Sequence, residues 1–440
     1  MPTSPGKRPR SALPALMVGL LVLALPPSLS AAQQESPWVS LTLEEALTRA
    51  LKVSPQIVQA QGTIRNAAAS ERSAFGAYLP GLSFSAGSSL GSSGRADPTT
   101  GITVSDSYNA GLSASWDVFT GFRRSNERKR AHAEAQSAEA QLVGQRFTVE
   151  LSVERVFFEA LRAEELMTVA KARIERAQQG VEAAERRLAV GSATRSDVLR
   201  SQLELNTAQE SLLQLENQRL TSGLSLGRLV GVDGPVDPAP SGPLEPTPIQ
   251  SSRDEVIASL VAQAPSVKSA EAAVLAAEAG IGTARTQYYP TVRLSGGYDW
   301  FNQEFGLAGG RTGWSVRLGL SYPIFNGFQR EEGMVRARTQ AEVAQAQLLD
   351  TRRAVRSEAE RVMSQLPLAE QRVSMARQAV EVAAEDLRVQ QERYRLGATT
   401  ILELLTSQAN LVEAQNNLVS LRFDYLLSRA ELESILGRKL

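Results

Sequence analysis

Two short segments of the sequence place a hydroxyl group and a carboxylate three residues apart, shortly after a glycine. The matching positions are Gly191, Thr194 and Asp197 in the first segment, and Gly397, Thr400 and Glu403 in the second. Glycine readily ends a helix because it adopts the left-handed conformation. A threonine followed three residues later by an acid is the capping box that begins the next helix. These residues therefore predict two helix breaks, and any further role for either acid depends on where the fold places it.

Side chains suited to catalysis or metal binding are otherwise scarce. The 440 residues include one histidine, His132, and no cysteine. This composition excludes disulfides and thiolate sites, and it leaves little material for zinc ligation or Ser-His catalysis. Lysine plus arginine and aspartate plus glutamate both total 47, so charge does not indicate a nucleic-acid partner. We expect no enzymatic activity, no cofactor and no nucleic acid.

The first 32 residues are typical of a secretory signal peptide. Three cations near the start precede an apolar segment at 13–25, and the small residues at 30–32 suit cleavage before Gln33. A membrane anchor is the alternative, although prolines at 14, 26 and 27 bound a segment too short to span a bilayer. We therefore expect residues 1–32 to be a signal peptide and the protein to be exported.

The two breaks belong to an internal repeat, because the positions of each pair lie 206 residues apart. Serine–glutamine at 201–202 recurs at 407–408, and alanine–glutamine at 208–209 recurs at 414–415. Upstream of the central helices the offset is 210 residues, as in the pair Pro80 and Pro290. The sequence predicts a first structural repeat over 33–231, a proline- and glycine-rich linker over 232–252 and a second repeat over 253–440.

Each repeat is expected to contain a helix, a β-hairpin, a long helix, the break and a returning helix. The first helices span about 43–76 and 253–286, and the long helices span about 125–188 and 330–395. Apolar residues recur every seven positions in the returning helix, at Leu404, Leu411, Leu418, Tyr425 and Leu432. This spacing predicts antiparallel left-handed coiled coils, with a kink at Pro367.

Strict alternation between apolar and polar residues predicts four strands. Leu82 and Phe84 alternate with serines, Leu112 and Trp116 alternate with Ser113 and Asp117, and similar patterns follow near 291–301 and 314–322. The connecting loops are expected at about 91–107 and 302–313. Aromatic residues gather at one end of these strands: Phe75, Tyr78, Phe119, Phe122, Tyr288, Tyr289, Phe325 and Phe328.

An apolar strand face and an aromatic girdle are typical of a membrane β-barrel. The alternative is ordinary core packing of these aromatics where helices meet strands. Four strands cannot close a barrel, and open edges are costly in lipid, so the edges are expected to pair with other copies of the chain. Two copies would supply eight strands and three would supply twelve; the polar face favours the larger number.

The order of elements, the duplication and the YRLGATTILELL break (394–405) resemble the TolC-like outer-membrane factor family over essentially the whole mature chain. The resemblance implies an α+β fold of long coiled coils with four membrane strands per chain. It also implies a homotrimer with a 12-stranded β-barrel in outer-membrane lipid and a 12-helix tunnel through the periplasm of a Gram-negative cell. It further implies a passive exit duct for efflux or type I secretion, supplied by a periplasmic adaptor and an inner-membrane pump of RND or ABC type.

The resemblance also assigns roles to the two breaks, which would form the periplasmic tip. Glu403 would line the constriction, Thr406 stands where some members carry a second acid, and Thr399 stands where a family arginine contributes to closure. Asp197 and Tyr394 would bond across neighbouring coils and hold the mouth shut. The turns at Gly191 and Gly397, with Leu188 and Leu396, would dock the adaptor.

Two other classes of function are weighed against this channel. A secreted structural coiled coil would not need four amphipathic strands or an aromatic cluster. An enzyme could use Asp117 and Asp299 as a carboxylate pair, but charge that faces a water-filled lumen is the commoner explanation. The sequence names neither the cargo nor the class of pump.

Overall fold

The computed structural model describes residues 38–96, 103–240, 257, 261–303, 305–306 and 309–439. The predicted signal peptide and part of the predicted linker lie outside these residues. In the first half the elements are β1 (Val39–Thr42), α1 (Leu43–Val53), α2 (Pro55–Gly76), β2 (Gly81–Ala96), β3 (Thr103–Phe119), α3 (Arg123–Ala189), α4 (Arg195–Val230) and β4 (Val236–Ala239). In the second half they are α6 (Pro265–Arg285), a 3₁₀ turn (Thr286–Tyr288), β5 (Thr291–Asn302), β6 (Arg311–Ser321), α7 (Gln329–Arg395) and α8 (Ile401–Leu436).

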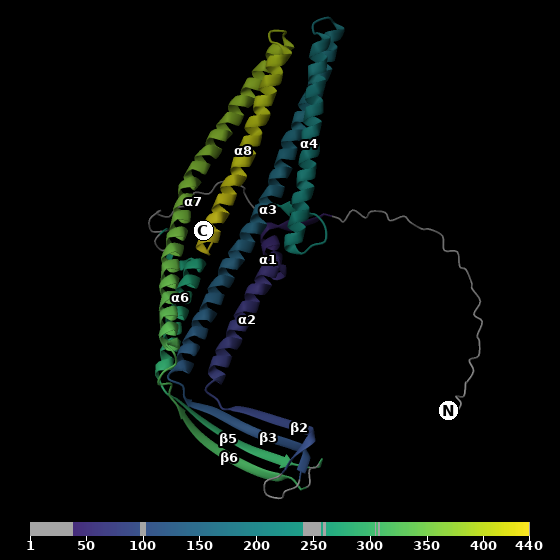
Figure 1. The fold of residues 1–440 in the computed structure, drawn as a ribbon. Helices are drawn as coiled ribbons and strands as arrows, with labels where there is room; N and C mark the ends of the chain where they lie inside the picture. The colour runs from purple at the N-terminus through teal and green to yellow at the C-terminus, as the bar shows by residue number, and fades with distance from the viewer. Residues whose placement is uncertain are drawn as a thin grey trace, which may run out of the picture. The chain divides into compact units, whose positions relative to one another are not determined.

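The long helices α3 and α7 organise the fold. Each contains 67 residues, which corresponds to a length of about 100 Å. Each packs against the helix that follows it, α4 or α8, and against a shorter helix that precedes its hairpin, α2 or α6. The break turns lie at the end of the helices away from the sheet, as Figure 1 shows. The predicted bounds of the long helices are thus confirmed to within two residues.

The coiled-coil seam of the second half is largely as the heptads predict. Leu404, Leu411, Tyr425 and Leu432 are buried, whereas Leu418 is half-buried. Leu404 and Leu411 pack in one cluster with Leu387 and Tyr394 of α7. Helix α7 also runs unbroken through Pro367, so a kink at that position stays a prediction.

The first helix of the first half is not continuous, and the prediction of one helix over 43–76 was wrong. Helix α1 ends at Val53, Ser54 is extended with φ −61° and ψ 122°, and Pro55 begins α2. The proline ring disfavours a helical conformation in the residue before it, whereas proline fits the first position of a new helix. Ala264 has similar angles, φ −55° and ψ 133°, and Pro265 begins α6, so the prediction of one helix over 253–286 was wrong for the same reason.

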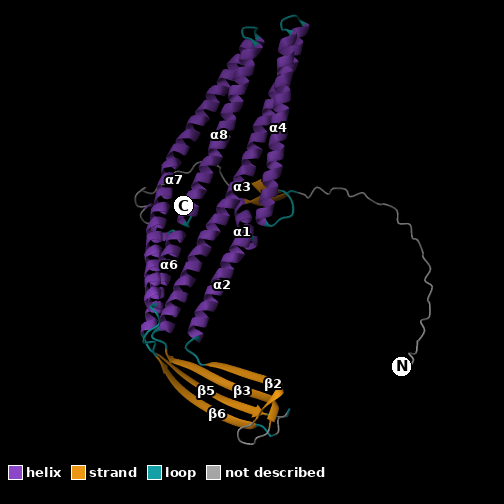
Figure 2. Ribbon diagram, in the orientation of Figure 1, coloured by secondary structure: helices purple, strands orange, loops and turns teal. Residues whose placement is uncertain are grey.

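The four longer strands form one antiparallel sheet in the order β2-β3-β5-β6 (Figure 2). The register confirms the two predicted faces: Leu112 pairs with Phe84 on one side and Tyr298 on the other, while Ser113 pairs with Ser83 and Gly297. Large apolar side chains on the first face, including Leu82, Phe84, Trp314 and Leu318, are exposed. Strand β2 extends to Ala96 and β3 begins at Thr103, so the first hairpin loop is shorter than predicted.

A second, two-stranded sheet was not predicted. Strand β1 pairs in parallel with β4, with Val39 opposite Val236, and β4 lies within the segment predicted to be a linker. Val236 is fully buried and belongs to the largest hydrophobic cluster, together with Phe157 of α3 and Leu226 of α4. This sheet therefore ties the start of the first repeat to the segment after it.

Glu154 of α3 is a buried acid beside this cluster, and its protonation is expected to make stability depend on pH. Burial raises its pKa to about 7; the Lys439 charge opposes this shift, whereas the nearby Glu433 and Glu150 add to it. The folded-state pKa exceeds the ordinary carboxyl value. Glu154 therefore does not lower the free energy of unfolding at low pH, and it lowers that free energy progressively as pH rises from about 4.5 to about 7.

Replacing Glu154 with glutamine is therefore expected to stabilise the protein at pH 8 by about 3 kcal/mol and to change little at pH 4. Thermal unfolding of both proteins in detergent at the two pH values measures this difference. Glu139→Gln, at an exposed position of the same helix, is the control and is expected to be neutral at both pH values. An equal effect of Glu154→Gln at pH 4 and pH 8 would contradict the assignment.

Candidate functional site

The turn between α3 and α4 has the capping geometry that the sequence predicts. Gly191 has a φ of +76°, and the Ser192 amide donates to the Arg187 carbonyl at 2.8 Å. The Thr194 amide donates to the Asp197 carboxylate at 2.9 Å, and the Asp197 amide donates to the Thr194 hydroxyl at 3.2 Å. These hydrogen bonds from the Thr194 backbone and hydroxyl lower the pKa of Asp197. Asp197 is therefore an ionised cap at neutral pH.

The turn between α7 and α8 repeats the backbone but not the reciprocal cap. Gly397 has a φ of +77°, and the Glu403 amide donates to the Thr400 hydroxyl at 3.4 Å. The Glu403 carboxylate, however, accepts a hydrogen bond from the Thr399 hydroxyl instead of the Thr400 amide. The prediction of a complete capping box at Thr400 and Glu403 was therefore wrong, because a neighbouring hydroxyl competes for the carboxylate. Glu403 is exposed at this turn.

Arg187 joins the two turns, and sequence reasoning did not single it out. Its Nη1 donates to the Tyr394 carbonyl at 2.5 Å, and its guanidinium carbon lies 4.4 Å from the centre of the Tyr394 ring. The repeat could have pointed to it, since Arg393 is its equivalent in the second half. Arg187 Nη2 and Arg393 Nη2 donate to the carbonyls of Ser192 and Ala398 in their own turns, at 3.5 and 3.4 Å.

Tyr394 and Asp197 lie near each other, but they are not hydrogen-bonded in the single chain. Tyr394 is buried, and its hydroxyl makes no hydrogen bond of ordinary geometry within the described part of the chain. Burial raises the pKa of Tyr394; the Arg187 charge lowers it, and the Asp197 charge raises it. The predicted bond between Tyr394 and Asp197 across neighbouring coils therefore stays a prediction, with an unpaired hydroxyl in place to make it.

Large apolar side chains are exposed on both turns. Leu396 is 74% exposed and Leu188 is 39% exposed, and Val190 beside Gly191 is also exposed. Thr406 lies one turn into α8, where its hydroxyl donates to the Leu402 carbonyl at 2.8 Å. The two turns thus expose apolar side chains and carry two acids. The contacts described between the two turns are those of Arg187.

The aromatic residues at the other end of the helices form two corners between helix and sheet. Phe122 packs edge-to-face on Phe119 and Tyr289, with ring centres 5.6 and 5.7 Å apart, and Phe325 packs on Phe328 at 5.4 Å. Phe122 and Phe328 have positive φ values of 69° and 66°, a conformation that bulky residues rarely adopt. The predicted clustering of aromatics at one end of the strands is confirmed.

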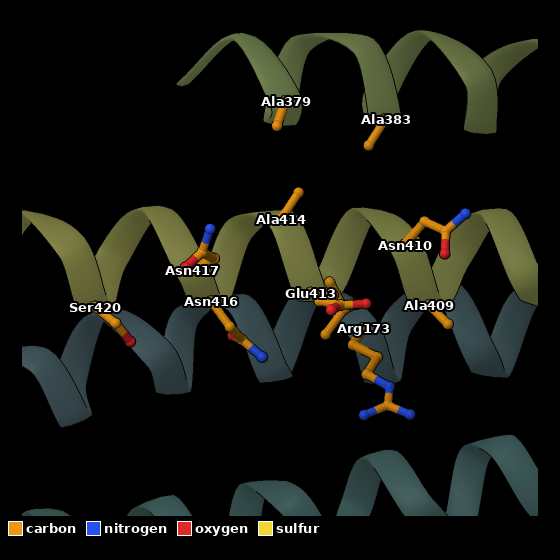
Figure 3. A pocket seen from close by; sticks show the side chains of 11 residues that line it. Arg173, Ala379, Ala383, Ala409, Asn410, Glu413, Ala414, Asn416, Asn417 and Ser420 are labelled. Atoms are coloured by element: carbon orange, nitrogen blue, oxygen red, sulfur yellow. The ribbon is translucent and has the colours of Figure 1, made fainter. Parts of the chain in front are cut away.

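The coiled coils carry an open groove that is lined by α3, α7 and α8 (Figure 3). It has a volume of about 790 Å³, and its walls include Ala379 and Ala383 of α7 and Asn410 and Asn417 of α8. Arg173 of α3 lies at its edge and donates to Glu204 of α4 at 2.8 Å. Small side chains and amides suit helix packing in such a groove better than catalysis.

No helix in the described ranges combines the length and the hydropathy that crossing a membrane requires.

Comparison with known proteins identifies the family. A family model described as outer membrane efflux protein matches residues 46–232 and 256–438. The chain belongs to the outer membrane efflux protein family. The matched ranges correspond to the two halves of the internal repeat.

Relatives of the outer membrane efflux protein family cover most of the chain. Protein CyaE of Bordetella pertussis is 31% identical over 85% of this chain and 79% of its own length. The pyoverdine export outer membrane protein OpmQ of Pseudomonas aeruginosa is 27% identical over 90% of this chain and 85% of its own. The crystal structure of VceC from Vibrio cholerae superposes with a TM-score of 0.76 at 22% identity, over 90% of this chain and 96% of that one.

These findings confirm the resemblance seen in the sequence. As a member of the outer membrane efflux protein family, the chain is a transport protein of the Gram-negative outer membrane. The solved neighbours are outer-membrane channels that share the fold of this chain. The family is one of channels and transporters and not one of enzymes.

Proposed function

We propose that three copies of the chain close one twelve-stranded barrel in the outer membrane and one tunnel of twelve helices below it. The observation that carries this proposal is the sheet: its edge strands, β2 and β6, each pair on one side only, and its apolar face is exposed. Unpaired backbone groups cost several kcal/mol each in lipid, so the edges of one chain must pair with those of its neighbours.

The same assembly gives the break turns a function as the periplasmic mouth. Threefold symmetry places three copies of Glu403 around the opening, where a ring of carboxylates favours cations. The Thr399 hydroxyl donates a hydrogen bond to each Glu403 carboxylate. Thr406 carries a neutral hydroxyl at the position of a possible second acid, so only one ring of carboxylates is expected. Arg187 ties the two turns of one chain together, and Asp197 with Tyr394 completes the closure between coils.

The exposed turns are the docking surface for the remaining components. Leu188 and Leu396, with the backbone turns at Gly191 and Gly397, offer apolar contacts at the tip for a periplasmic adaptor protein. An inner-membrane pump of RND or ABC type would then deliver cargo into the tunnel. The channel itself is passive: it conducts substrates from the periplasmic tip to the exterior for efflux or type I secretion.

The face assignment of the sheet can be tested with single cysteines, since the native chain contains none. Cysteines at Ser113 and Ser315 are expected to react with a membrane-impermeant charged thiol reagent, because both lie on the lumen face. Cysteines at Leu112 and Trp314, one position earlier in each strand, are expected to be protected by lipid. The reverse pattern of labelling would show that the polar face does not line the pore.

A further inference from the structure

A basic groove lies between α2 and α3, beside the aromatic corner of the first half. Its volume is about 830 Å³, and it is lined by three cations, Arg72 of α2 with Arg128 and Lys129 of α3, and by His132 of α3. Phe75 and Tyr78 complete its end nearest the sheet. The groove is therefore both cationic and bordered by the residues predicted to lie at the lipid–water interface.

One contact at the corner links this groove to the apolar face of the sheet. Trp116 belongs to the apolar face, and its Nε1 donates to the Tyr78 carbonyl at 2.9 Å. On the polar face, Asp117 binds Arg293 at 2.6 Å and Arg123 at 3.8 Å. Tyr78 lines the groove and is bonded through its backbone carbonyl to Trp116, so this end of the groove borders the apolar face.

The cations of the groove lack carboxylate partners. Within the described ranges, Arg72, Arg128 and Lys129 form no ion pair. The one acid in the lining is Glu71, whose carboxylate lies 2.9 Å from His132 Nδ1. Three exposed cations thus line one groove with a single carboxylate, which contacts His132 and none of the three.

The second repeat shows that these cations are not needed to build the corner. Arg124 lies 4.8 Å from the ring centre of Tyr78, and its repeat equivalent Arg330 lies 5.0 Å from that of Tyr288. Both arginines also donate to backbone carbonyls at their corners. The positions equivalent to Arg72, Arg128 and Lys129, in contrast, are Gly282, Met334 and Val335. The stacked arginine is shared by both corners, whereas the basic groove occurs in one.

We infer that this groove binds the phosphate group of an anionic phospholipid in the periplasmic leaflet of the outer membrane. Arginine and lysine donate charge-assisted hydrogen bonds to phosphate oxygens, and the guanidinium fork matches two of them at once. Phe75 is exposed beside the cations and would contact the glycerol or the first methylenes of the lipid. The inference rests on the proposed placement of the sheet in the membrane.

Native mass spectrometry of the full chain, purified as its assembly in detergent, tests this inference. Phosphatidylglycerol and phosphatidylcholine are titrated separately, and inorganic phosphate is added as a competitor in a third arm. We expect phosphatidylglycerol to bind more tightly than phosphatidylcholine. In the triple variant Arg72→Gln, Arg128→Gln, Lys129→Gln we expect phosphatidylglycerol to bind at least about tenfold more weakly.

The control removes the same charge from exposed cations elsewhere: Lys52→Gln, Lys171→Gln, Arg200→Gln. It is expected to bind phosphatidylglycerol as the wild type does. Equal binding of the two lipids by the wild type, or equal losses in both triple variants, would overturn the inference. If inorganic phosphate binds as tightly as phosphatidylglycerol, the groove recognises free phosphate and not a lipid headgroup. Bilayer conductance of the groove variant, Arg72→Gln, Arg128→Gln, Lys129→Gln, is expected to equal that of the wild type. A wild-type protein that does not conduct would refute the proposed function and not this inference.

Discussion

Arg187→Ala is expected to open the isolated channel, with a rise in open probability of at least about tenfold. The substitution removes the hydrogen bond from the guanidinium to the Tyr394 carbonyl and the contact with the Tyr394 ring. In a trimer it does so three times around one opening. The contact between Arg187 and Tyr394 joins the two turns. Its loss is therefore expected to let the two coiled coils move apart, with little effect on the helices themselves.

Single-channel recording in planar bilayers, without adaptor or pump, measures this effect. Arg393→Ala is the matched control, because Arg393 donates to the carbonyl of its own turn as Arg187 does but makes no described contact with the other turn. Arg187→Lys is expected to be intermediate, since it keeps the charge but loses the planar fork. If Arg187→Ala stays as closed as the wild type, or if Arg393→Ala opens equally, Arg187 does not hold the mouth closed.

Glu403→Gln is expected to abolish most of the cation preference of the channel and its block by multivalent cations. The substitution removes three charges from the mouth of a trimer, while the glutamine oxygen can still accept the Thr399 hydroxyl. Folding is expected to be nearly unchanged, since Glu403 is exposed and does not complete a capping box.

Reversal potentials in a salt gradient measure the preference, and added multivalent cations measure the block. Glu392→Gln is the control: it removes an exposed acid near the same turn, but that acid is paired with Arg395 at 3.0 Å. An unchanged reversal potential in Glu403→Gln, or an equal change in Glu392→Gln, would rule out a ring of Glu403 at the constriction.

Periodic features of the sequence predicted the structure well, because a repeating pattern averages over many residues. The alternation along the strands gave the correct faces of Leu112 and Ser113, and the heptads gave the buried positions of Leu404 and Leu432. The glycine breaks were equally readable, because a left-handed residue leaves few alternatives to Gly191 and Gly397.

Features that depend on a single local competition were harder to predict. The break at Ser54 was readable from Pro55, but the helical pattern on both sides concealed it. Strands β1 and β4 have four residues each, too few for alternation to show. Val236 of β4 is buried in a core built from segments that are distant in sequence. Thr399 took the Glu403 carboxylate because two adjacent threonines compete for it, and spacing alone does not choose between them.

The role of Arg187 could not be read from spacing, because its partner Tyr394 lies 207 residues away in sequence. The repeat makes Arg187 and Arg393 equivalent, yet their surroundings differ, since one turn presents Leu188 where the other presents Tyr394. Contacts of this kind arise from how the two halves pack and not from either half alone.

The mass of the detergent-extracted channel shows how many chains form it, and every role proposed for the sheet and the mouth requires closure by several chains. Native mass spectrometry combined with conductance of the same fraction measures both properties. We expect the conducting species to contain three mature chains, and we expect dissociation to single chains to abolish conductance. A monodisperse single chain that still conducts would contradict it, and so would a conducting pair with eight strands.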